Sequence, residues 1–130
     1  MKIDKDYIKL LLNNIEDTER AVFRITDIAD QEEYVSEKFV QHMRILSEKG
    51  LILCDAHDST DIGINRIGRG DVSWGIKWLR LTSDGYDFIE TLNNDTVWNK
   101  IMKDLKTPGI TTLMSTAKFL LQETIKIQIS

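Results

Sequence analysis

Three consecutive features of residues 39–85 predict an α+β fold of the winged helix-turn-helix type. A stretch with helical apolar spacing ends at Gly50. Two runs rich in strand-forming residues then flank a loop at 58–71 that contains three glycines, and Thr82 can cap a new helix. A helix, a hairpin wing and a further helix in this order are typical of winged helices, which mostly bind nucleic acid or protein. The fold alone does not decide between these functions.

The N-terminal segment predicts a helix at about 5–15. Either Asp4 or Asp6 could cap this helix, because a short polar side chain can accept a hydrogen bond from a free backbone N–H group of the first turn. Four apolar residues at helical spacing define the face that should be buried: Ile8, Leu11, Leu12 and Ile15.

The next segment predicts a short strand at 21–25 and a long helix at 31–49. Asp30 and Glu33 form a capping box at the start of that helix, which would be the recognition helix of a winged domain. Only residues 26–29 lie between the strand and the capping box. The helix that normally braces a recognition helix is therefore predicted to be abbreviated to a single turn, which weakens the case for DNA binding.

The central segment predicts two wing strands at 51–57 and 74–81, joined by the glycine-rich loop. Apolar groups occupy both faces of the second run, so the sequence does not show which face is buried. After this strand, Thr82 begins a helix whose apolar stripe follows helical spacing: Gly85, Phe88, Ile89 and Leu92.

Two more helices are predicted near the C-terminus, separated by Pro108. Asn94 or Asp95 caps the first, and Thr111 or Thr112 begins the second. We expect a winged-helix domain at 1–106 and a C-terminal amphipathic helix at 107–130 within the same overall domain. The first of these helices carries its apolar stripe on Trp98, Ile101, Met102 and Leu105.

The composition indicates an ordinary soluble protein. No apolar run approaches the roughly 18 residues of a membrane span, so we expect no membrane association and a cytoplasmic location in a bacterial host. Cys54 is the single cysteine, which fits a reducing compartment. The net charge of −4 argues against a general nucleic-acid coat, but residues 63–80 carry a local net charge of +3 on the predicted wing.

DNA binding would use the exposed face of the 31–49 helix and the basic wing. On that helix, Gln41 could pair with the edge of adenine and Arg44 with the edge of guanine, whereas Glu37 and Glu48 on the same face would repel phosphate. The alternative is a solvated face, and the wing cations could equally serve solubility. The candidate DNA-binding residues are Lys38, Gln41, Arg44, Arg66, Arg69 and Lys77.

Protein binding is the competing hypothesis. Trp74 and Trp78 have the even spacing that places residues on one strand face, where they would form a docking platform if exposed or close the core if buried. The last helix has more apolar residues than one packed face needs, so we expect a symmetric homodimer through it. The candidate dimer residues are Leu113, Met114, Ala117, Leu120, Leu121 and Ile125.

Catalytic and metal sites are not predicted. Cys54 and His57 would point to opposite faces of a strand, whereas a structural zinc site needs four converging ligands. His42, the other histidine, falls at the core edge of its helix, so a buried thiol and a partly buried imidazole are expected. No phosphate-binding glycine loop, nucleophile elbow or catalytic carboxylate pair is present. We therefore expect neither enzyme activity nor a cofactor.

Three segments of the chain are distinctive: residues 39–52, residues 81–89 and the Asp-Thr-Val-Trp-Asn-Lys sequence at 95–100, which is the most specific. Together they resemble a family of uncharacterised winged-helix-like proteins from phages, prophages and Gram-positive bacteria. The resemblance spans nearly the whole chain and implies the fold and a phage-linked setting, but no activity. Together with the predicted recognition helix and basic wing, it leads us to expect a non-catalytic phage-type transcriptional regulator that binds double-stranded DNA. The alternative is an accessory or inhibitor factor that uses the same scaffold to bind a host or phage protein.

Overall fold

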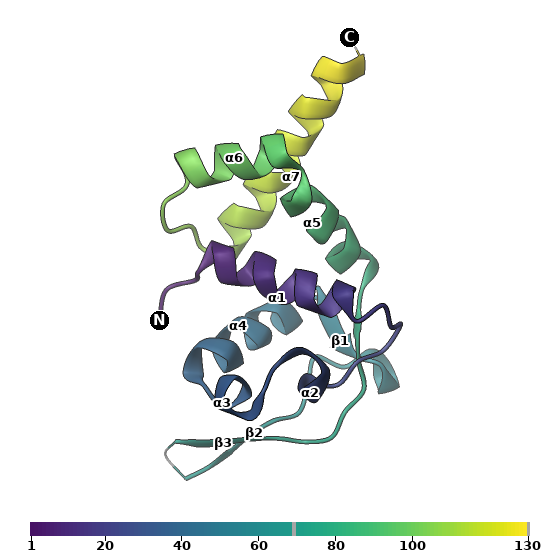
Figure 1. Cartoon of the computed structure of the whole chain (residues 1–130), viewed down its shortest axis with the longest axis vertical. Coiled ribbons are helices and arrows are strands. Elements are labelled where there is room, and N and C mark those ends of the chain that lie inside the picture. Colours follow the sequence, from purple (N-terminus) through teal and green to yellow (C-terminus); the bar gives the residue numbers. More distant parts are fainter. Residues whose placement is uncertain (69, 130) are drawn as a thin grey trace.

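The computed structural model describes residues 1–68 and 70–129. Helix α1 (Lys5–Asp17) crosses the middle of the molecule, as Figure 1 shows. On one side of α1 lie helices α2 to α4 and the β2–β3 hairpin, and on the other side lie α5, α6 and α7. Within the described residues, no helix combines the length and the apolar composition that a membrane span needs.

Helix α1 forms as the sequence predicts and extends slightly further. The carboxylate of Asp4 accepts a hydrogen bond from the backbone N–H of Tyr7 at 3.1 Å, which identifies Asp4 as the cap. Lys5 is also buried, and its ammonium group donates to the carbonyls of Leu105 and Lys106 after α6. The four residues of the predicted apolar face are all buried in the core: Ile8, Leu11, Leu12 and Ile15.

The predicted helix at 31–49 is in fact two helices, α3 (Gln31–Tyr34) and α4 (Glu37–Glu48). Ser36 has an extended backbone, and its hydroxyl accepts from Phe39 N at 3.2 Å and donates to the Glu33 carbonyl at 2.6 Å. The prediction of one continuous helix was therefore wrong, because Ser36 ends one helix and caps the next.

Helix α2 (Ile25–Ile28) is the single turn that the sequence predicts before the capping box. Asp30 then caps α3, as predicted, so two single turns precede α4. The strand predicted at 21–25 reduces to one bridge, in which Phe23 exchanges two backbone hydrogen bonds of 2.8 Å with Leu79. Ile25 already belongs to α2, which shortens the extended segment.

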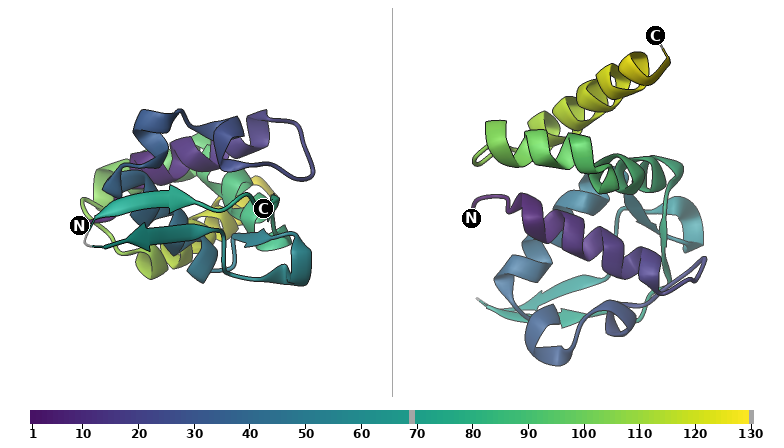
Figure 2. Two further views of the ribbon diagram at one scale, coloured as in Figure 1. Left: turned by 90° about the horizontal axis from the view of Figure 1, so that it is seen from below. Right: turned by 45° about the horizontal axis from the view of Figure 1, so that its top comes forward.

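The strands form two small antiparallel sheets. Strand β1 (Ile52–Cys54) pairs with β4 (Leu79–Leu81), and β2 (Ile64–Ile67) pairs with β3 (Asp71–Trp74), as Figure 2 shows for the hairpin. The single strand predicted at 74–81 is thus divided at residues 75–78. The strand predicted at 51–57 ends at Cys54, and the chain then forms a short 3-10 turn.

Helices α5 (Ser83–Asn93) and α6 (Asp95–Asp104) follow β4 and are capped by Thr82 and Asn94, as predicted. The apolar stripe of α5 is buried as predicted, whereas the stripe of α6 is displaced. Val97 and Ile101 are fully buried on α6, but Met102 is exposed. The prediction for Met102 was wrong because Val97, one turn before Ile101, faces the core instead.

Helix α7 (Ile110–Ile129) packs its first half on α5 and α6, and its C-terminal half projects from the body (Figures 1 and 2). The complete chain is an α+β fold. Its order of helix, bridge, short helices, α4, strand, hairpin and strand is consistent with a winged-helix arrangement.

Candidate functional site

The central feature of the candidate interface is the face of α4 that points away from the core. Phe39 and Met43 are fully buried on the opposite face, which fixes the rotation of the helix. Gln41 and Arg44 lie one turn apart and are half-buried. Neither side chain forms a hydrogen bond or a salt bridge with another described residue, although the charge of Arg44 contributes to lowering the pKa of Glu37.

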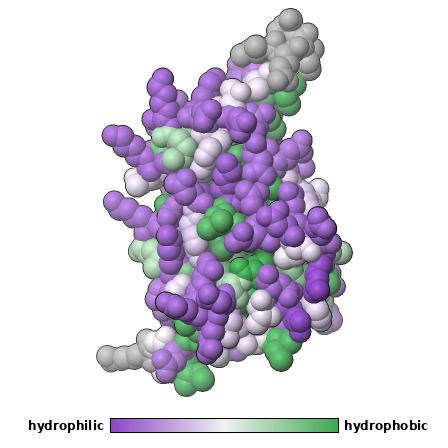
Figure 3. All heavy atoms as spheres, in the orientation of Figure 1, coloured by the Kyte–Doolittle hydropathy of each residue, from purple (hydrophilic) through white to green (hydrophobic). Residues whose placement is uncertain are grey.

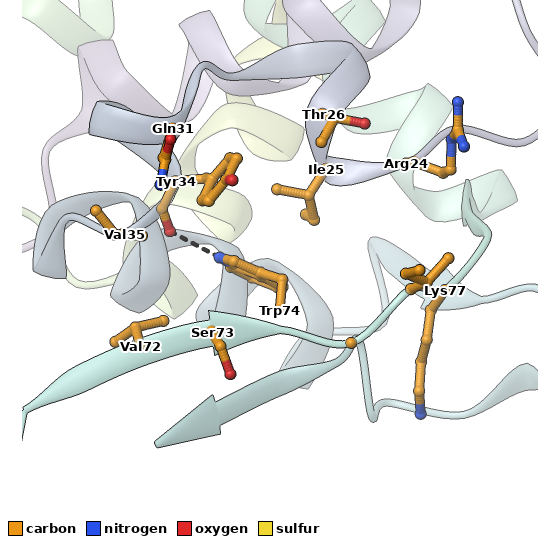
Figure 4. Close-up of a pocket in the computed structure, with 12 residues that line it drawn as sticks. Arg24, Ile25, Thr26, Gln31, Tyr34, Val35, Val72, Ser73, Trp74 and Lys77 are labelled. Carbon is orange, nitrogen blue, oxygen red and sulfur yellow. Dashed lines mark hydrogen bonds between the residues drawn. The ribbon is translucent and has the colours of Figure 1, made fainter. Parts of the chain in front are cut away.

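The β2–β3 hairpin docks against α3 and the start of α4 through Trp74. Its indole N–H donates to the Tyr34 carbonyl at 2.7 Å, drawn as a dashed line in Figure 4. The indole also meets the ring of Phe39 edge-on, with ring centroids 5.7 Å apart at an interplanar angle of 70°. One aromatic side chain therefore anchors the hairpin to the helical layer.

A bidentate salt bridge between Arg66 on β2 and Glu37 at the start of α4 adds a second attachment. Both nitrogen–oxygen distances are 2.8 Å. The hydrogen bond from Arg66 lowers the pKa of Glu37 below its ordinary value of 4.5, and Glu37 in turn raises the pKa of Arg66. Arg66, which the sequence predicts as a phosphate ligand, is thus already paired with a carboxylate.

Other cations of this region are paired in the same way. Lys38 lies 3.0 Å from Asp4, and Lys77 lies 3.0 Å from Asp61. These hydrogen bonds lower the pKa of both carboxyl groups. Arg80 contacts Asp58 at 2.7 Å. The described cations that contribute to the local charge of +3 are therefore paired in space, because the acidic partners of Arg66, Lys77 and Arg80 all lie outside residues 63–80. Arg69 lies outside the described residues.

The two tryptophans do not share a strand face, because the predicted strand is interrupted between them. Trp74 is half-buried beneath α3 and α4, whereas Trp78 keeps 45% of its surface exposed. The guanidinium of Arg24 lies 4.9 Å from the centre of the Trp78 ring. The single docking platform predicted from their spacing is therefore not formed.

A groove of about 440 Å³ separates β3 from α2 and α3 (Figure 4). One wall is formed by residues 72–77 and the other by residues of α2, α3 and their flanks. In Figure 4, Val72 and Trp74 project toward the helices, whereas Ser73 projects to the other side. The sequence does not predict this groove, because its walls are brought together only by the docking of Trp74.

The comparisons with known proteins decide the family. The sequence matches the family described as hypothetical protein (DUF2513) over residues 2–111, which is most of the chain. The chain belongs to the DUF2513 family. This confirms the resemblance to an uncharacterised family that the sequence suggests. No curated protein and no solved structure matches the sequence.

The segment matched to DUF2513 includes α4, the hairpin and the groove, and it ends just after α7 begins. On α7, Leu113 and Ala117 are fully buried within the chain, so these two predicted dimer residues serve its own core. Met114, Leu120 and Leu121 are half-buried. Ile125 is 43% exposed and Phe119 is 59% exposed, which leaves apolar surface on the projecting part of the DUF2513 chain.

The remaining candidates take structural roles in this DUF2513 protein. His42 is buried, and its Nε2 accepts a hydrogen bond from Asp4 N at 2.9 Å while its Nδ1 lies 2.7 Å from the Lys38 carbonyl. Because a backbone N–H can only donate, the ring is neutral with its proton on Nδ1. The imidazole therefore ties the start of α1 to α4, a role that the sequence did not reveal.

Cys54 is a buried thiol, as predicted. His57 lies in the 3-10 turn after β1 with a φ of 67°, so the prediction that it shares a strand with Cys54 was wrong. Among the described side chains, no three from His, Cys, Asp and Glu are grouped so that they could hold a metal ion.

Proposed function

We propose that this DUF2513 protein is a non-catalytic winged-helix regulator that binds double-stranded DNA through the exposed face of α4. The observation that carries the proposal is that Gln41 and Arg44 lie side by side on α4 without a hydrogen bond or salt bridge to a described residue, whereas Lys38, Arg66 and Lys77 are each paired with a carboxylate. A protein that reads base edges needs a few such free side chains on a rigid helix.

The proposed contacts divide into base reading and backbone positioning. The amide of Gln41 can pair with adenine, and the guanidinium of Arg44 can pair with guanine in the major groove. Arg66 would exchange the carboxylate of Glu37 for a phosphate oxygen and so position the hairpin against the DNA backbone. Few cations contact DNA in this proposal, which agrees with the acidic net charge of the protein. The phage-linked setting and the bacterial cytoplasm belong to this proposal as its expected biological context.

A low-salt binding measurement tests the proposal. We expect the protein to retain members of a pool of short duplexes with a randomised centre, and we expect Arg44→Glu to abolish this binding. Because only Arg66 is proposed to neutralise a phosphate, the logarithm of the binding constant should fall with the logarithm of salt concentration with a slope of about −1. Glu37→Gln, which releases Arg66, should strengthen binding.

The matched control is Lys100→Glu, which makes the same charge change on the exposed surface of α6, away from α4 (Figure 1). This variant should bind like the wild type. Absence of duplex binding by the wild type at low salt, or equal losses in Arg44→Glu and Lys100→Glu, would contradict the proposal.

A second candidate function is protein binding without DNA, as an accessory or inhibitor factor. The pairing of the wing cations with acidic residues favours it, since paired cations attract polyanions weakly. On the face shown in Figure 3, polar residues dominate and apolar residues form small separate patches. A protein partner would therefore bind at a local site rather than over the whole of this face. The groove beside β3 is the first candidate for that site.

We also propose that two copies of the chain associate through α7. A cavity of about 590 Å³ lies between α5 and α7, with Phe88, Met114 and Leu121 among its apolar lining. Acidic residues of α5 and Lys118 of α7 lie on its rim, so two copies related by a twofold axis would present opposite charges to each other. The acidic rim residues are Asp84, Asp87 and Glu90.

Light scattering after size-exclusion chromatography tests the dimer. We expect twice the chain mass at micromolar concentration for the wild type and the monomer mass for Phe119→Glu, because a buried unpaired carboxylate would oppose association. Met102→Glu is the control, since Met102 is a similarly exposed apolar residue but belongs to α6 rather than α7. A monomeric wild type would refute the proposed association.

A further inference from the structure

The outer edge of β3 carries backbone groups without a partner. Gly75 N donates to the Gly63 carbonyl at 2.7 Å, directly beyond the register pair Ile64 and Trp74. In an antiparallel ladder, opposed residues alternate between pairs that exchange hydrogen bonds and pairs that do not. The N–H and C=O groups of Val72 and Trp74 therefore point away from β2. No described residue forms a hydrogen bond with these outward groups.

The groove runs along this same edge. Residues 72–77 line it consecutively, although successive side chains of a strand project to opposite faces. The groove is therefore bounded by the backbone edge of β3 and its continuation, together with the hairpin face that carries Val72 and Trp74. Its opposite wall comes from α2 and α3 and includes Ile25, Tyr34 and Val35.

Exposed apolar side chains flank the groove. Ile76 is 91% exposed and Val35 is 41% exposed, so both offer apolar surface beside the groove. Arg24 and Lys77 also line the groove, and none of its lining residues is acidic. Lys77 is paired with Asp61, whereas the guanidinium of Arg24 lies over the Trp78 ring and forms no salt bridge with a described carboxylate.

We propose that the outer edge of β3 binds an extended, acidic segment of a partner protein as an additional strand. The backbone groups of Val72 and Trp74 would pair with the backbone of the segment, as in other cases of strand addition. None of the residues proposed to contact DNA lines the groove, although Arg66 lies opposite Val72 in the hairpin. The inference is thus independent of DNA binding.

The chemistry of the groove specifies the partner. Alternate residues of the added strand would lie toward the apolar surface of Val35, Val72 and Ile76, so they should be aliphatic or aromatic. A carboxylate near one end would be attracted by Arg24. The partner segment is therefore a β-prone peptide with alternating apolar residues and at least one acidic residue, free to adopt an extended conformation.

Selection from a random peptide library displayed on phage, with the full chain as bait, tests this proposal. We expect enrichment of acidic, β-prone sequences. Val72→Pro removes an outward N–H and should reduce the affinity of the selected peptides by about fivefold or more, because one backbone hydrogen bond is lost and the added strand is displaced. Ile64→Pro is the matched control, because it removes an outward N–H on β2, at the opposite edge of the same hairpin, and should leave peptide binding unchanged.

Two further measurements separate the mechanism from a loss of folding. Selected peptides with N-methylated backbones should fail to bind the unaltered protein. Arg24→Glu should weaken the selected acidic peptides, whereas Lys100→Glu, with the same charge change on α6, should not. Arg44→Glu, which should abolish DNA binding, should leave peptide binding unchanged because Arg44 does not line the groove. Failure of either proposal is therefore recognised separately.

The proposal is overturned if the selection yields no such sequences, or if the selected peptides tolerate both Val72→Pro and N-methylation. It is also overturned if the wild type self-associates and the Val72→Pro variant does not. That result would assign the edge of β3 to a second copy of the chain.

Discussion

Replacing Gly85 with alanine is expected to destabilise the fold severely, although alanine is normally the better residue within a helix. A Cβ atom at this position would overlap with the backbone oxygen of Leu51 and lie 3.2 Å from both the Leu51 carbonyl carbon and Leu81 Cδ2. The Leu51 oxygen cannot move freely, because it accepts a hydrogen bond from Thr82 N at 3.0 Å. Helix α5 and the start of β1 would have to separate.

The expected loss is about 3 kcal/mol of unfolding free energy, the upper part of the range for overpacked cores. This loss exceeds the gain of about 1 kcal/mol that alanine gives over glycine in a helix interior. Urea denaturation followed by circular dichroism measures the difference.

Gly109→Ala is the matched control, since an added Cβ there would meet nothing within 4 Å. This variant should remain within about 0.5 kcal/mol of the wild type, as surface substitutions usually do. Equal denaturation midpoints for Gly85→Ala and the wild type would show that α5 does not approach β1 as closely as described.

Replacing Trp74 with alanine is expected to release the hairpin from the helical layer. The substitution removes the hydrogen bond to the Tyr34 carbonyl and the edge-on contact with Phe39. Because Trp74 is half-buried, we expect a loss of about 2 to 3 kcal/mol, below the range for a fully buried aromatic residue. Hydrogen exchange should accelerate in β2 and β3, and peptide binding along β3 should disappear, because the groove loses one wall.

Trp78→Ala tests whether this effect is specific to the anchoring tryptophan. Trp78 is half-exposed and interacts with Arg24 through its ring face, a contact worth about 0.5 to 1 kcal/mol. Its replacement should therefore leave hydrogen exchange of the hairpin unchanged. Similar acceleration in both variants would contradict the assignment of Trp74 as the anchor.

The parts of the fold that depend on neighbouring residues could be predicted from the sequence. The caps Asp30 and Thr82 were identified outright, and Asp4 and Asn94 were each one of two candidates, because a capping side chain acts on the backbone two or three residues away. The buried face of α1 was identified for the same reason, since helical spacing repeats within a few residues.

The parts that depend on tertiary contacts could not be predicted. Residues 74–81 read as one strand, but Trp74 turns toward α3 and Leu79 pairs with Phe23 and β1, so the chain leaves the sheet between them. The break at Ser36 was missed because the apolar spacing continues across it. A serine can lie within a helix or cap one, and here the capping role prevails.

The candidate site shows the same division. The sequence identified Gln41, Arg44 and Arg66 as candidates from their types and spacing. It could not reveal that Arg66 is paired with Glu37, because these residues are far apart in the chain and meet only after the hairpin docks. The groove was missed for the same reason, since its two walls come from separate segments.

The salt bridge between Glu37 and Arg66 makes the protein's own carboxylate a competitor for any anion that approaches the hairpin. A ligand gains from Arg66 only the difference between its own interaction and that of Glu37, so an isolated anion gains little. A polyanion with several closely spaced charges can displace the carboxylate while it also contacts Arg44. The carboxylate of Glu37 thus lowers the affinity of the hairpin for anions. A substitution at position 37 alone would change that affinity.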